Sequence, residues 1–127
     1  MNIYNKGLNQ TFDEVVIGKI KGIGGVPILE VVNPDDPSTS SIEGTDLCGF
    51  VSVNTGTGSV AGKICDITFS KPRVLGDNYV PIISQSISTT PGRLYWLNND
   101  EEGFEVFTLD VPANNDEFKF SYFIASY

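Results

Sequence analysis

The chain contains no histidine, and this absence excludes more chemistry than any other feature of the sequence. Histidine is the usual general base near neutral pH, the partner of serine and cysteine nucleophiles, and the commonest transition-metal ligand. Paired carboxylates could still hydrolyse glycosides, but the acidic side chains lie among turn residues, where solvated carboxylates are expected. These candidates are Asp35, Asp36, Asp100, Glu101, Glu102, Asp116 and Glu117. We therefore predict that the protein is not an enzyme and uses no cofactor.

Basic residues are also few. Eight lysines and arginines stand against sixteen acidic residues, which gives a formal net charge of -8. This balance repels phosphate backbones and anionic lipid surfaces, so we expect neither nucleic acid nor a membrane as a partner. No apolar run approaches the length that spans a bilayer, and residues 1–7 lack the apolar segment of an export signal. We expect a protein that is made in a cytoplasm.

Cysteine occurs twice, as Cys48 and Cys65, and both fall in predicted strands among apolar neighbours. A reducing cytosol disfavours a disulfide, and two thiols alone make a poor metal site. We therefore expect two buried free thiols. The oxygen-rich segments 98–102 and 114–117 could supply calcium ligands, but acidic turns of this kind are more often only solvated.

No segment keeps a helical period over three turns, whereas short alternating runs recur with turn residues between them. The predicted strands are residues 12–20, 26–32, 47–53, 58–60, 63–70, 79–84, 94–97, 104–109 and 117–125. The polar residues 1–11 read as an arm or anchor, and residues 33–45 as the longest surface loop. This pattern predicts an all-β protein with one domain over residues 12–127, built as an antiparallel β-sandwich or jelly roll.

The last predicted strand is apolar on both of its faces. Phe118, Phe120, Tyr122 and Ile124 alternate on one face, while the residues between them are partly apolar as well. The facing sheet of a sandwich covers one side only, so the second cover has to come from a loop, a neighbouring subunit or a larger assembly. We therefore predict an oligomer interface that includes Phe118, Phe120, Tyr122, Phe123 and Tyr127.

A second candidate surface combines aromatic rings with polar groups from neighbouring predicted strands or loops. Its members are Tyr79, Arg93, Tyr95 and Trp96. Stacking rings beside hydrogen-bonding groups are typical of a sugar site. A single tryptophan in a β domain is, however, more often part of the core. Core packing and a lectin-like ligand face both remain open for these residues.

Several of these strands together resemble a known pattern. A glycine- and threonine-rich hairpin over residues 49–60 precedes a strand that ends at Lys71-Pro72, and Tyr79-Val80-Pro81-Ile82-Ile83 follows. A strand that begins Gly103-Phe104 and the aromatic strand 118–124 complete it. Residues 48–127 thereby resemble the β domains that end many bacteriophage fibre and virion-decoration proteins.

The resemblance implies a non-enzymatic structural protein of a virion. Such proteins are usually trimers that attach to capsid or tail proteins, and their exposed ends often bind host glycans. The short chain fits a capsid decoration protein or a short head or tail fibre, attached through the arm at residues 1–11. A trimer would also cover the second apolar face of the last strand.

Overall fold

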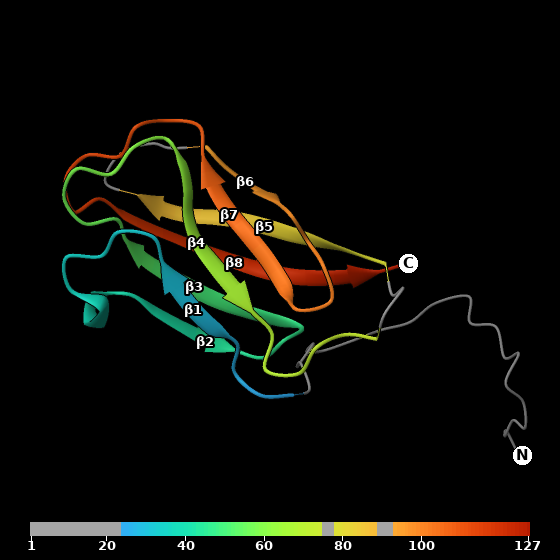
Figure 1. Ribbon diagram of the computed structural model, residues 1–127. Coiled ribbons are helices and arrows are strands. Elements are labelled where there is room, and N and C mark those ends of the chain that lie inside the picture. The colour runs from blue at the N-terminus through green and yellow to red at the C-terminus, as the bar shows by residue number, and fades with distance from the viewer. Residues whose placement is uncertain (1–23, 75–77, 89–92) are drawn as a thin grey trace, which may run out of the picture.

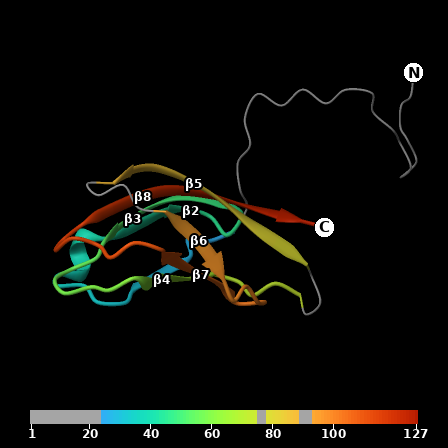
Figure 2. The ribbon, with the colours of Figure 1, turned by 90° about the horizontal axis from the view of Figure 1, so that it is seen from above.

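The computed structural model describes residues 24–74, 78–88 and 93–127 (Figure 1). Within these residues the chain forms two antiparallel four-stranded sheets that pack face to face, and Figure 2 shows them as two layers. The all-β sandwich predicted from the sequence is therefore confirmed. The predicted arm at residues 1–11 and the predicted strand at residues 12–20 lie outside the described residues.

Each sheet combines strands that are distant in the sequence. Sheet A has the order β1 (Ile28–Val31), β4 (Gly62–Thr68), β7 (Gly103–Thr108), β6 (Leu94–Leu97). Sheet B has the order β2 (Ser41–Gly44), β3 (Cys48–Asn54), β8 (Glu117–Ser126), β5 (Tyr79–Ser88). The last strand, β8, is thus an inner strand of sheet B with β3 and β5 on its two sides.

The core lies between the two sheets and follows from the alternation of side chains along each strand. In β8 the side chains of Phe118, Phe120, Tyr122 and Ile124 are at most 2% exposed. They meet inward side chains of the other strands, among them Val51, Val53, Cys65, Ile67, Phe104 and Val106. Burying one large apolar side chain contributes about 1.5–3 kcal/mol, so these positions dominate the stability of the sandwich.

Two predicted elements were wrong, for local reasons. Residues 58–60 form a loop and not a strand, and Gly56 and Gly58 adopt left-handed φ angles of 71° and 77° that break the extended backbone. The predicted loop 33–45 contains the short strand β2, in which Ile42 packs against the core. One inward apolar residue on a four-residue edge strand is too little alternation to predict a strand.

The remainder of the predicted loop 33–45 includes a single helical turn, η1 (Pro37–Thr39). Its N-terminal cap is Asp36, whose carboxylate accepts a hydrogen bond from the backbone N–H of Ser38 at 2.9 Å. Among the described residues no helix is long and apolar enough to cross a membrane.

Candidate functional site

The outer face of sheet A carries a network of charged side chains. A β-bulge in β4 causes part of this charge. The register of β4 against β7 shifts between Lys63 and Cys65, so Ile64 is an extra, buried residue. In a regular strand, residues 63 and 66 would point to opposite faces. The bulge brings both Lys63 and Asp66 to the outer face.

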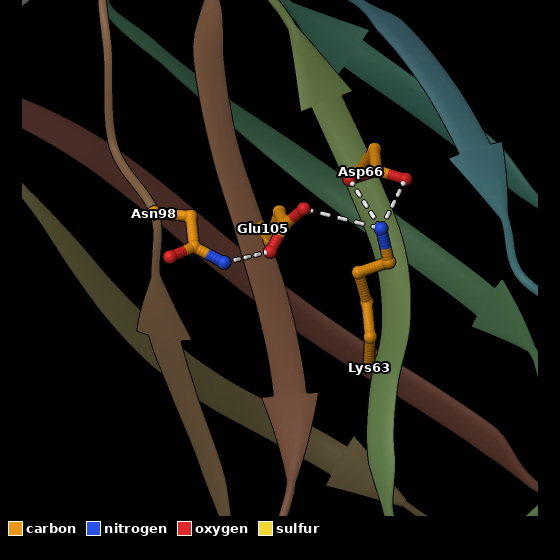
Figure 3. Close-up of polar contacts among 4 residues, drawn as sticks. All are labelled: Lys63, Asp66, Asn98 and Glu105. Atoms are coloured by element: carbon orange, nitrogen blue, oxygen red, sulfur yellow. Dashed lines mark hydrogen bonds and ion pairs between the residues drawn. The ribbon is translucent and has the colours of Figure 1, made fainter.

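Lys63 is the centre of an ion-pair network on this face (Figure 3). Its ammonium Nζ lies 3.1 Å from Oδ2 of Asp66 and 3.1 Å from Oε1 of Glu105. The side-chain amide of Asn98 donates a hydrogen bond to the other carboxylate oxygen of Glu105. Asp66 pairs in register with Glu105 on one side and with Glu30 on the other. Lys63 therefore offsets the repulsion within a row of three acids.

A shallow depression of about 200 Å³ lies beside this network, and its lining includes Glu30, Asp66, Asn98, Asp100, Glu102 and Glu105. The carboxylate of Asp100 accepts hydrogen bonds from the backbone N–H groups of Glu102 and Gly103 at 2.8 and 3.1 Å. This oxygen thus holds the turn between β6 and β7. The part of the chain that the structure describes contains no group of three or more acidic or cysteine side chains arranged to hold a metal ion.

The network predicts a stability that depends on pH. Hydrogen bonds from Asn98 and then Lys63 hold the pKa of Glu105 below its ordinary value of 4.5, and Glu105 chiefly raises the pKa of Lys63 above 10.5. The stabilisation by Glu105 is present above the pKa of the unfolded chain and is lost as the pH falls through the lowered folded value. The stabilisation by Lys63 is present below pH 10.5 and is lost as the pH rises through its raised folded value.

We therefore expect Glu105→Gln to lower the urea midpoint at neutral pH and to cost progressively less as the pH falls and the wild-type carboxyl takes up its proton. Urea unfolding of both proteins at several pH values measures this difference, which reports Glu105 together with the groups of its network, Lys63 and Asp66. A gap between the two midpoints that is constant with pH would contradict the prediction.

The predicted ligand face of Tyr79, Arg93, Tyr95 and Trp96 is not one surface, and this prediction was wrong for two of its members. Tyr79 is 3% exposed, and Trp96 packs against the core, because both point between the sheets. Tyr95 lies opposite Phe107 on the outer face of sheet A, and their rings stack with centroids 5.3 Å apart. Arg93 is exposed and pairs with Asp110 at 3.4 Å.

Tyr79 instead joins the two sheets. Its hydroxyl donates to the backbone carbonyl oxygens of Gly103 at 2.6 Å and Asp100 at 2.8 Å. Its ring makes an edge contact with Phe69, and the guanidinium of Arg73 lies 5.0 Å from the ring centroid. Burial raises the pKa of Tyr79 to about 12, so the hydroxyl stays protonated as this donor over the whole physiological range.

The outer face of sheet B is apolar toward the C-terminal end of β8. Phe123 lies in register between Cys48 on β3 and Ile82 on β5, and the next row pairs Ala125 with Val80. Ile82 is 53% exposed, Phe50 is 39% exposed, and Tyr127, directly after β8, is 83% exposed. We call this surface the Phe123 patch; its members are Cys48, Phe50, Val80, Ile82, Phe123, Ala125 and Tyr127.

The patch corrects the predicted oligomer interface. Phe118, Phe120 and Tyr122 are at most 2% exposed in the core and have no surface to offer a partner, since the facing sheet covers them. Phe123 and Tyr127, on the other face of the strand, retain exposed surface. Cys48, Phe50 and Ile82 were missing from the prediction, because only the register of three strands brings them beside Phe123.

Both cysteines are free thiols, as expected, but only one of them is buried. Cys65 is fully buried in the core, and this burial raises the pKa of its thiol. Cys48 is half-buried within the Phe123 patch, so the prediction that it is buried was wrong. The two thiols therefore differ in their access to solvent.

Comparison with known proteins identifies no relative. No family model matches the sequence. Neither the curated proteins nor the solved structures include a match. No matched relative therefore bears on the resemblance between residues 48–127 and phage fibre or decoration domains.

Proposed function

We propose that this chain is a non-enzymatic structural protein of a virion, a β-sandwich that self-associates as a trimer and attaches to capsid or tail proteins. The Phe123 patch carries the proposal, because it is a contiguous apolar surface on a sheet whose other face is already covered by the core. Exposed apolar patches with a polar surround are typical of sites of protein association.

The acidic side chains support a structural role and not a catalytic one. Asp35 accepts hydrogen bonds from the backbone and hydroxyl of Thr57 at 3.1 and 2.6 Å, and so joins two loops. Asp36 caps a helical turn and Asp100 holds a turn. Such carboxylates are acceptors fixed in place by the fold. The assignment to a virion comes from the resemblance of residues 48–127 to phage β domains.

The native mass in solution tests this proposal. Light scattering on a sizing column, at physiological salt and at several loading concentrations, should give a mass that rises toward three times the 13.8 kDa of the chain. A mass of one chain at every concentration would contradict self-association.

Glycan binding is a second candidate, favoured by the stacked rings of Tyr95 and Phe107 on the outer face of sheet A. Asn98 and Glu105 on the same face offer hydrogen-bonding groups beside the depression, and sugars bind rings and polar groups in this combination. We expect binding on a glycan panel to be lost in Tyr95→Ala and kept in Tyr127→Ala, an aromatic truncation outside this face. Absence of binding across a broad panel would remove this candidate.

A further inference from the structure

The Phe123 patch contains no charged side chain, although the chain has a formal net charge of -8. The outward residues of its rows are apolar or are the serines Ser84 and Ser121, while Glu43 lies opposite Phe50 on β2, at the rim of the patch. Two copies of such an acidic chain repel one another over most orientations. They can approach closely where neither copy presents a charge.

The edges of sheet B are poor places for a second copy to add. The outer edge strand β5 contains Pro81, which has no N–H to donate, and its register is broken between Gln85 and Ile87. The opposite edge, β2, has only four residues and ends at Gly44. Prolines, bulges and short strands are the features that prevent strand addition at sheet edges. Within the described part of sheet B, the outer face therefore offers a better apolar surface for contact than either edge.

We propose that the Phe123 patch packs against the Phe123 patches of the other copies about the axis of the trimer. The inference rests on the proposed function and names the surface through which self-association occurs. A charged partner could form no ion pair with the side chains of the patch. A second copy, by contrast, presents the same flat, uncharged and apolar surface. Phe123 lies at its centre, so any packing that covers Phe123 also covers its neighbours Cys48 and Ile82.

The size of the patch sets the strength of the contact. Three strands at about 4.8 Å spacing and six residues at about 3.3 Å give a face of about 300 Å². A stable interface covers about 800 Å² on each partner. Association through the patch is therefore weak and depends on concentration, and copies held side by side on a particle gain from their high local concentration.

Cys48 provides a native reporter for this contact. We expect its rate of alkylation by iodoacetamide, followed by intact-mass spectrometry, to fall as chain concentration rises from micromolar toward millimolar, in step with the mass from light scattering. Cys65 is fully buried and should stay unmodified at every concentration, so its labelling reports any unfolding.

Two variants test the contact from neighbouring strands. Phe123→Asp and Ile82→Asp should each abolish the rise in mass and keep Cys48 reactive at all concentrations, because an unpaired charge would enter the contact. Ile82 is 53% exposed on an edge strand, so its variant tests the patch even where Phe123→Asp fails to fold. Val60→Asp is the matched control: it adds the same charge at a 72% exposed residue in the β3–β4 loop and should assemble as the wild type does.

The outcomes separate this inference from the proposed function. Assembly with protected Cys48, lost in both patch variants and kept in Val60→Asp, supports both. Assembly that leaves Cys48 equally reactive and survives both patch variants overturns the contact through the Phe123 patch, while self-association stands. A monomer with reactive Cys48 at every concentration overturns the contact and the proposed self-association together.

Discussion

Replacing Phe120 by alanine should lower the free energy of unfolding by about 3–5 kcal/mol. The side chain is fully buried in β8, and its residue lies in register between Val51 on β3 and Gln85 on β5. Truncation leaves a cavity in the core. The surrounding side chains cannot move in to fill it, because hydrogen bonds to β3 and β5 hold β8 in place on both sides. Domains of this size have about 5–15 kcal/mol of stability in total, so the variant should approach the limit of folding.

Urea unfolding followed by tryptophan fluorescence, at low micromolar concentration to disfavour association between chains, measures this effect. Phe50→Ala is the matched control, since Phe50 lies one position from Val51 on β3 but is 39% exposed on the outer face. We expect the control to cost about 1 kcal/mol or less. Equal losses in the two variants would show that the inner face of β8 is not the core.

Two strands rich in apolar and aromatic residues were predicted to within one residue. The predicted strand 94–97 coincides with β6, and the predicted strand 117–125 is one residue shorter than β8. Alternation predicts these strands because an inward side chain at every second position is what buries one face of a sheet. The prediction failed at β2, where Ile42 is the sole inward apolar side chain.

The candidate sites could be predicted only in part, because they depend on register between distant strands. The two-faced composition of β8 is visible in its own sequence, and it predicted that Phe123 and Tyr127 need a cover. Cys48 and Ile82 are 75 and 41 positions from Phe123 in the sequence and join it only by pairing. No local pattern specifies which residues of β3 and β5 lie beside a given residue of β8.

The charged network on sheet A was invisible for a different reason. Lys63 and Asp66 are three residues apart, a spacing that places side chains on opposite faces of a regular strand. The bulge at Ile64 reverses this, but bulges have no strong sequence signal in a run of apolar residues such as Ile64-Cys65. For Trp96 the sequence left core packing and a ligand face open, and the structure packs its partly buried side chain against the core.

Gly103→Ala should be strongly destabilising. A Cβ atom at Gly103 would lie 2.0 Å from the carbonyl oxygen of Ile67 and 3.0 Å from the Cα of Thr68. These are backbone atoms of the neighbouring strand β4, so no side-chain rotation relieves the contact. The start of β7 would have to move away from β4, and the carbonyl that accepts the Tyr79 hydroxyl would move with it. We expect a loss of about 3 kcal/mol or more in the free energy of unfolding.

Gly58→Ala separates this steric effect from the general cost of replacing glycine. Gly58 has a positive φ of 77° and no atom within 4 Å of the added Cβ, so strain in the backbone is the only expected penalty, about 1 kcal/mol. Urea unfolding of the two variants gives the comparison.

If the Tyr79 hydroxyl holds the sheets together through Gly103, then Tyr79→Phe should add little further loss in the Gly103→Ala background, because the shared contact is already broken. Full additivity of the two losses would show that the Tyr79 bond survives the displacement of β7.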